Sequence, residues 1–202
     1  MAGVNPREKL LNAAIDHIAE RGISDLSLRE LAAAIGSSHR MLIHHFGGRE
    51  GLLVAVVQTV EERQRALLDD VIPDPEAAPA DAMRAWWKHI SQEALWANER
   101  LFFELYGQAL QGRPGTVALL DGIIDAWLEP AATVFTQLGF EDGKAAARLG
   151  IAVTRGLLLD LLATREVEQV DAAMNVHIAA LEALMTSRAV KSATHSRVSS
   201  GS

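Results

Sequence analysis

The feature that most constrains the fold is the segment 27–46, whose sequence SLRELAAAIGSSHRMLIHHF predicts two short helices joined by a tight turn. Ser27 is a favourable N-cap, and Glu30, three residues later, can complete a capping box. Apolar residues then recur with helical spacing on one face, at Leu28, Leu31, Ala32 and Ile35. Gly36 ends this helix, because glycine readily adopts the left-handed conformation at a helix C-terminus. Two short helices joined by a Gly-containing turn form a helix-turn-helix.

The second helix of this motif has one apolar face and one polar face. Ser37 or Ser38 can cap its start, and Leu42 and Phe46 lie four residues apart, so they can be buried together. The opposite face carries His39, Arg40, Ile43 and His44. Its donors suit phosphates and base edges, and no Asp or Glu occurs between Glu30 and Glu50. The pattern is therefore consistent with a DNA-reading helix, and also with the solvated face of an ordinary helical hairpin.

The composition predicts an all-α protein. Of 202 residues, 49% are hydrophobic and 5% aromatic, and long Ala-, Leu-, Glu- and Arg-rich runs favour helices over strands. There is no cysteine, and we expect neither a secretory signal nor a membrane span, so the expected location is the cytoplasm. The net charge is −7, so any contact with nucleic acid has to be a local feature of the surface.

The order of the predicted helices indicates two domains. Residues 1–50 form the helix-turn-helix domain, 51–70 a connecting helix, 71–188 a larger helical domain, and 189–202 a disordered tail. The boundary lies in the proline-rich segment 71–80, VIPDPEAAPA. Beyond it we expect helices over residues 81–97, 98–110, 116–138, 142–164 and 167–187.

Residues 7–60 resemble the N-terminal domain of the tetracycline-repressor (TetR) family of bacterial transcription regulators. The resemblance rests on motifs that follow one another without a gap, namely Gly22, Ser27-Leu-Arg-Glu-Leu31-Ala32, Ile35-Gly36-Ser37-Ser38, Leu42-Ile43-His44-His45-Phe46 and Arg49-Glu50-Gly51-Leu52. Three positions depart from the family pattern. Ile43 replaces a usual Tyr, and Arg49 replaces a usual Lys. Arg40 occupies a position where a small residue is usual, so we expect this chain to recognise a base sequence of its own.

The resemblance implies a sequence-specific DNA-binding regulator, which we expect to be a repressor released by a small-molecule effector. It implies DNA contacts from Ser27, Ser37, Ser38, His39, Arg40, Met41, Ile43, His44, His45 and Arg49. The position of Arg49 also favours a DNA contact. A cation at a helix N-terminus opposes the helix dipole and is unfavourable there by itself. It becomes favourable when a phosphate lies between the guanidinium and the free N–H groups.

The last two predicted helices, 142–164 and 167–187, carry more apolar surface than one buried face needs. Two copies of this hairpin can form a four-helix bundle, and in the resembled family these helices form the dimer interface. Two heads related by a two-fold axis would read a palindromic operator in double-stranded DNA. The alternative is that this surface packs within one chain.

The resemblance also implies an effector cavity in the middle helices, where the tryptophans are concentrated. Candidate contacts to a small apolar or aromatic effector are Trp86, His89, Phe102, Phe103, Tyr106, Trp127 and Arg155. Each aromatic residue can equally be an ordinary core residue, and Arg155 can instead pair with Asp160.

The two other classes of function are an enzyme and a protein-interaction module. An enzyme is disfavoured because His39, His44 and His45 lack the spacing and the carboxylate neighbours of a metal or catalytic site. We therefore expect no catalytic residue, metal or cofactor. The other alternative is a helical protein-interaction module that does not bind DNA.

Overall fold

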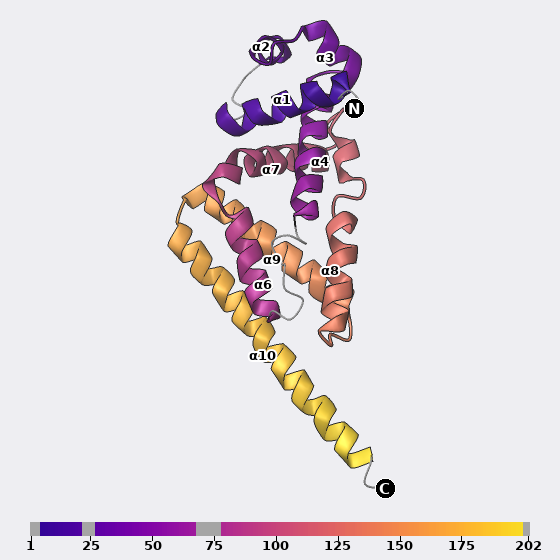
Figure 1. The fold of residues 1–202 in the computed structure, drawn as a ribbon, viewed down its shortest axis with the longest axis vertical. Helices are drawn as coiled ribbons and strands as arrows, with labels where there is room; N and C mark the ends of the chain where they lie inside the picture. The colour runs from indigo at the N-terminus through magenta and orange to yellow at the C-terminus, as the bar shows by residue number, and fades with distance from the viewer. Residues whose placement is uncertain (1–4, 22–26, 68–77, 200–202) are drawn as a thin grey trace. The chain divides into compact units, whose positions relative to one another are not determined.

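The computed structural model describes residues 5–21, 27–67 and 78–199, and the side chains of this set up to residue 187. Gly22 and most of the proline-rich segment 71–80 lie outside the described residues. Every regular element in the described ranges is helical (Figure 1). The elements are α1 (Pro6–Arg21), α2 (Leu28–Ala34), α3 (His39–Phe46), α4 (Arg49–Ala66), α6 (Pro79–Ile90), η1 (Glu93–Leu95), α7 (Trp96–Leu110), η2 (Val117–Leu120), α8 (Asp125–Gln137), α9 (Gly143–Thr164) and α10 (Val167–Ser199).

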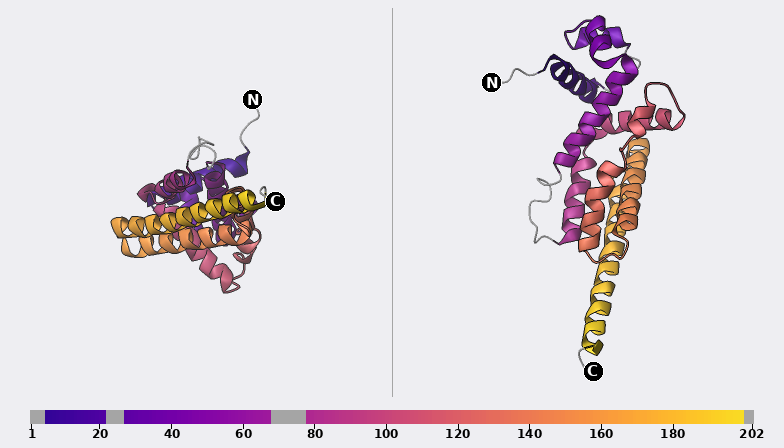
Figure 2. Two further views of the ribbon diagram at one scale, coloured as in Figure 1. Left: turned by 90° about the horizontal axis from the view of Figure 1, so that it is seen from below. Right: turned by 90° about the vertical axis from the view of Figure 1, so that its right-hand side faces the viewer.

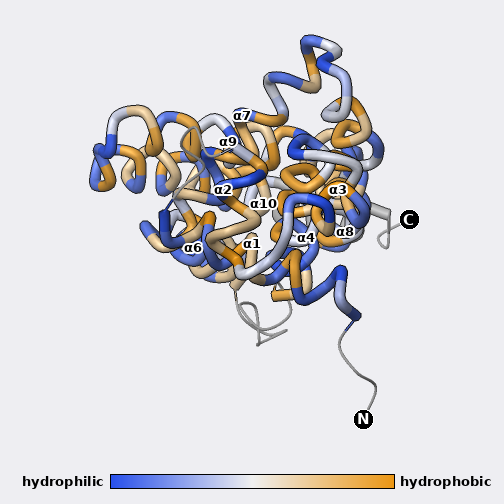
Figure 3. Tube along the Cα trace, turned by 90° about the horizontal axis from the view of Figure 1, so that it is seen from above, coloured by the Kyte–Doolittle hydropathy of each residue, from blue (hydrophilic) through white to orange (hydrophobic). Residues whose placement is uncertain are grey.

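Most of the helices bury one face and expose the other, and in Figure 3 hydrophobic and hydrophilic residues alternate along them. Helix α4 (Arg49–Ala66) differs, because the six consecutive residues 52–57 are all buried. The chain divides into two compact units, Met1–Leu68 with Ser91–Ile123, and Asp69–Ile90 with Ile124–Ser202. This division differs from the predicted one, which assigned residues 71–188 to a single domain.

The first unit is built around α4. Helices α1, α3 and α7 each pack on α4, α7 also packs on α1, and α2 packs on α3. The side chains buried between them are mainly aliphatic, among them Ala14, Ile18, Leu42, Leu52, Val56, Leu101 and Leu105. Helix α7 belongs to this unit because the face that carries Leu101, Leu105 and Ala109 is buried there. Its sequence predicts an amphipathic helix but does not specify the partner.

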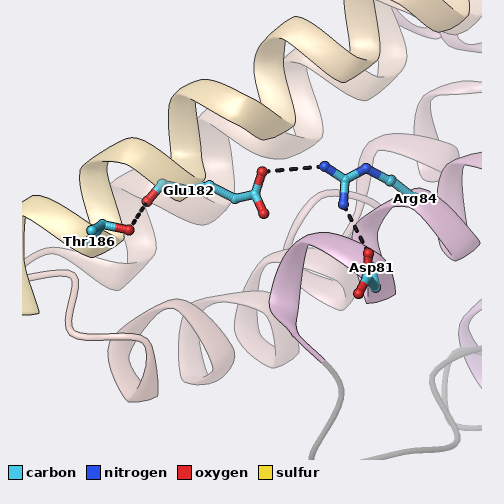
Figure 4. Close-up of polar contacts among 4 residues, drawn as sticks. All are labelled: Asp81, Arg84, Glu182 and Thr186. Atoms are coloured by element: carbon cyan, nitrogen blue, oxygen red, sulfur yellow. Dashed lines mark hydrogen bonds and ion pairs between the residues drawn. The ribbon is translucent and has the colours of Figure 1, made fainter.

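The second unit contains α6, α8, α9 and α10. Helix α8 packs on α9, and both α6 and α9 pack on α10 (Figure 2). Polar contacts also join α6 to α10. The Trp87 Nε1–H donates to Asp171 Oδ1 at 2.7 Å. Arg84 bridges Asp81 at 2.9 Å and Glu182 at 3.3 Å (Figure 4).

Three predicted segments differ from the structure. The expected helix 81–97 ends at Ile90 as α6, and η1 and the start of α7 follow it. The expected helix 116–138 is divided into η2 and α8, because Gly122 between them has φ of 72°, which an α-helix does not accommodate. The expected disordered tail from residue 189 is instead a continuation of α10, which reaches Ser199. No Gly or Pro occurs between residues 167 and 199 to end this Ala-rich helix.

Candidate nucleic-acid interface

Helix α2 begins with the capping box that its sequence predicts. The Glu30 N–H donates to Ser27 Oγ at 3.3 Å, and the Ser27 N–H donates to Glu30 Oε2 at 2.8 Å. Hydrogen bonding of the Glu30 carboxyl to the Ser27 side chain, and then to the Ser27 backbone N–H, lowers the pKa of that carboxyl below its ordinary value of 4.5. The start of α2 is therefore fixed by local interactions.

Helix α3 is fixed at both ends. Ser38 is its N-cap, and the Ser38 Oγ accepts a hydrogen bond from the Met41 N–H at 3.2 Å. Gly47 ends it in the left-handed conformation with φ of 76°, and the Gly47 N–H donates to the Ile43 carbonyl oxygen at 2.8 Å. An eight-residue helix is marginal alone, so these caps and its packing are what hold it.

The two faces of α3 are separated as predicted. Leu42 is completely buried and Phe46 is buried, whereas Arg40 and His44 are exposed. Met41 and Ile43, at 40% and 44% exposed, present apolar atoms on the surface of a short helix. An exposed face that combines a guanidinium, an imidazole and apolar groups has the chemistry needed to contact base edges and thymine methyl groups.

The remaining predicted contact residues vary in exposure. Ser27 and Ser38 are exposed, while Ser37, His39, His45 and Arg49 are half-buried. His45 differs most from the expectation, because its Nε2 atom is buried and has no hydrogen-bond partner among the described residues. The structure therefore exposes Arg40, Met41, Ile43 and His44 on α3, together with the two capping residues Ser27 and Ser38.

Two cations near this motif were not identified from the sequence. The Arg7 guanidinium of α1 lies 5.0 Å from the centroid of the Phe46 ring, a cation–π distance, at the C-terminal end of α3. Arg113, from the loop after α7, forms an ion pair with Glu50 at 3.7 Å. Glu50 is the acid that ends the acid-free segment, so Arg113 reduces the negative charge beside Arg49. Only tertiary contacts bring these two cations to the motif.

The predicted effector residues do not form one described cluster. Phe102, Phe103 and Tyr106 belong to the first unit, where Phe102 stacks on Tyr106 with ring centroids 5.5 Å apart. Trp86, His89, Trp127 and Arg155 belong to the second unit. There the centroid of the Trp86 ring lies 5.6 Å from the centroid of the His89 ring and 5.7 Å from that of the Trp127 ring.

The described residues contain no group of three or more His, Cys, Asp or Glu side chains arranged to hold a metal ion. In the same ranges, no helix combines the length and the apolar character required to span a bilayer.

The helix-turn-helix region matches a known family. The sequence profile described as "Bacterial regulatory proteins, tetR family" matches residues 10–56. This range includes the N-caps Ser27 and Ser38 and the whole of α3. The DNA-binding region of the chain, residues 10–56, is that of the TetR family.

Individual relatives agree with this assignment. The chain is 31% identical over 85 residues to the HTH-type transcriptional regulator BetI of Stenotrophomonas maltophilia, covering 41% of this chain and 43% of that protein. It is 32% identical over 115 residues to an HTH-type transcriptional repressor of Mycobacterium tuberculosis, covering 56% of each. The chain thus spans about half the length of the curated relatives it matches.

Solved structures show that the fold extends beyond the matched region. A transcriptional regulator from Rhodococcus has a TM-score of 0.72 at 22% identity, covering 87% of this chain and 95% of that one. Salmonella enterica GusR has a TM-score of 0.66 at 20% identity, covering 90% and 97%. At these identities the likeness shows a shared all-helical fold.

Proposed function

We propose that this chain is a homodimeric, sequence-specific DNA-binding regulator that represses transcription until a small molecule releases it. The observation that carries the proposal is the exposed Arg40, Ile43 and His44 face of α3, on a helix held by Leu42 and Phe46 beneath it. The helix lies within the region that matches the family profile. It is also acid-free in a chain of net charge −7, so the local field favours a polyanion there.

Double-stranded DNA is the proposed partner, bound in its major groove by α3. In this role Arg40 contacts a base edge, and Ile43 packs against the groove floor. Ser27, Ser37, Ser38, His39, Met41, His44, His45 and Arg49 complete the proposed contact set. Arg49 stands at the N-terminus of α4, where a phosphate would neutralise a cation that otherwise opposes the helix dipole. We place this function in the cytoplasm and assign the chain no enzymatic activity.

The proposed dimer interface is the uncovered apolar face of α9 and α10. On α9 the exposed residues recur with helical spacing and are apolar or small, at Ala145, Leu149, Ala152, Gly156, Leu159 and Ala163. Leu149 is 57% exposed, and Val176 on α10 is 71% exposed. Ala152 and Gly156 leave room for a close approach of a second helix, and a Cβ added at Gly156 would meet nothing within 4 Å in this protomer. Pairing of this face with its own copy would bury it symmetrically.

The effector is proposed to act through differential affinity for two arrangements of the DNA-binding heads, because a ligand can shift an equilibrium only in this way. The aromatic groups around Phe102 in the first unit and around Trp86 in the second are the candidate contacts. Both are consistent with an effector that has an apolar or aromatic part.

The test is selection of bound sequences from a random double-stranded DNA pool, followed by fluorescence anisotropy on the selected site. We expect a palindrome whose half-sites lie about one helical turn, or a multiple of it, apart. Binding to that site should be far tighter than to scrambled DNA at moderate salt. A pool that remains random after selection would overturn the proposal and leave a helical interaction module as the alternative.

A further inference from the structure

An ion pair joins the loop that follows α7 to the start of α4, inside the first unit. The Arg113 Nη2 atom lies 3.7 Å from Glu50 Oε1, and Glu50 follows Arg49 in the first turn of α4. The side chains of Arg113 and Glu50 are 53% and 35% exposed. An ion pair with this exposure adds little to stability, because water screens it. Stability alone therefore does not explain why an arginine stands here.

The backbone around Arg113 is held in place, so its side chain extends from a defined point. The Arg113 N–H donates to the Gln108 carbonyl oxygen at 3.1 Å, and the Thr116 hydroxyl donates to the Arg113 carbonyl oxygen at 2.9 Å. Thr116 is completely buried. A Cβ atom added to Gly115 would lie 3.0 Å from Glu50 Cβ, so the loop backbone itself reaches α4. The ion pair is thus part of the packing of this loop against the first turn of α4.

Cations from three separate segments gather around the junction of α3 and α4. Arg49 begins α4, the Arg7 guanidinium of α1 lies 5.0 Å from the centroid of the Phe46 ring, and Arg113 reaches Glu50. The whole chain has a net charge of −7, so these arginines concentrate positive charge on one part of an acidic protein. Such a surface complements the phosphate backbone of DNA, which accepts a large share of protein–DNA hydrogen bonds.

We propose that Arg113 contacts a DNA phosphate at or next to the one bound by Arg49, and that Glu50 holds the Arg113 guanidinium in position. This inference rests on the proposed function, which puts the start of α4 at the DNA backbone. A guanidinium has five N–H donors in one plane, so it can pair with a carboxylate and bind a phosphate oxygen at the same time. An arginine already held by Glu50 also loses less side-chain freedom on binding. Arg113 lies outside residues 10–56, the region that matches the family profile.

The first test is the salt dependence of DNA binding by the full chain, measured by fluorescence anisotropy. Arg113→Ala should make the salt slope shallower by about one for each bound protomer, because one phosphate contact is lost. At moderate salt it should weaken binding to the selected site and to scrambled DNA by the same factor, about threefold or more. Arg113→Lys should retain most of the slope, because the charge remains.

Arg100→Ala is the matched control for this test. Arg100 is an exposed arginine near the N-terminal end of α7, whereas Arg113 follows the C-terminal end of that helix. The control removes the same charge from the same unit without touching the start of α4. An unchanged slope in Arg113→Ala, or a change no larger than that in Arg100→Ala, would overturn the proposal.

The second test locates the phosphate with duplexes in which single phosphates are replaced by neutral methylphosphonates. One replacement should weaken binding of the wild type and of Arg100→Ala but have no effect on Arg113→Ala. It should lie at or next to the phosphate that Arg49→Ala identifies in the same way. If every replacement still weakens Arg113→Ala as it does the wild type, Arg113 touches no phosphate and the proposal is wrong. Arg113→Gln, which keeps a long polar side chain, replaces Arg113→Ala if urea unfolding shows that the alanine variant folds poorly.

The two proposals fail separately. Specific DNA binding with an unchanged salt slope in Arg113→Ala would overturn the Arg113 contact and leave the proposed regulator intact. If no DNA sequence is preferred, the proposed regulator is overturned. The salt slope on scrambled DNA then still tests Arg113, and a shallower slope in Arg113→Ala would support the phosphate contact.

Discussion

A Cβ atom added to Gly51, in the first turn of α4, would overlap the carbonyl oxygen of Phe46, the last residue of α3. The obstacle is backbone, which cannot move aside as a flexible side chain can. Glycine at position 51 therefore sets how closely α4 approaches the C-terminal end of α3.

Gly51→Ala should destabilise the protein by about 1–3 kcal/mol, the usual cost of forcing extra volume into a packed site. It should also weaken specific DNA binding, because α3 must shift. Urea unfolding and anisotropy on the selected DNA measure the two effects. Gly107→Ala in α7 is the matched control, because a Cβ there meets nothing within 4 Å. The control should stabilise the helix by about 0.4–1 kcal/mol. Equal effects of the two substitutions would contradict the packing argument.

The capping box of α2 predicts a pH-dependent contribution to stability. Ser27→Ala should cost about 1 kcal/mol at pH 7, because the Glu30 N–H loses its acceptor. The pKa of Glu30 is lowered in the folded state, so its contribution is complete above the unfolded value of 4.5 and is lost as the pH falls below it. The difference between wild type and Ser27→Ala, from thermal unfolding, should therefore shrink at pH 3. Ser37→Ala, which removes the cap of neither helix, should show no such trend.

Arg40 and Arg49 should affect DNA binding in different ways. Arg40→Ala should reduce discrimination at one base pair by about 1–3 kcal/mol, since a base-edge contact is lost. Arg49→Ala should weaken binding to all sequences alike and reduce the salt slope of the binding constant by about one. Anisotropy titrations with single-substitution operators at several salt concentrations separate the two patterns. A reversed pattern would exchange their proposed roles.

The dimer proposal predicts that charge on the α9 face breaks the assembly. Ala152→Glu should give monomers in sedimentation velocity, because an unpaired carboxylate would be buried in the interface. Ala118→Glu is the control, because Ala118 is an exposed alanine of η2, outside the proposed interface. A dimer that persists in Ala152→Glu would show that another surface mediates association.

His177 on α10 should make stability fall in mildly acidic solution. Burial lowers the pKa of its imidazole below the ordinary value of 6.5, so the folded state favours the neutral ring. Between the two pKa values the unfolded chain binds more protons, and stability therefore decreases as the pH falls below about 6.5. His177→Gln should reduce this slope in urea unfolding between pH 7 and pH 5 at fixed protein concentration. If the pH dependence of stability is the same in His177→Gln as in the wild type, other titratable groups cause it.

The sequence by itself determined the local structure of the helix-turn-helix. The capping box at Ser27 and the burial of Leu42 and Phe46 were predicted correctly, because they follow from interactions over a few residues. The sequence offered Ser37 or Ser38 as the next cap, and the structure has Ser38. The family motif likewise lies in one continuous stretch, residues 10–56.

Only the tertiary structure decided which helices pack together. The amphipathic pattern of α7 predicts a buried face, but many apolar faces can satisfy it, so its place against α1 and α4 was not predictable. The same applies to Arg7 over Phe46 and to Arg113 beside Glu50. These contacts join residues far apart in the chain, and hydrophobic burial, which drives such packing, is not directional.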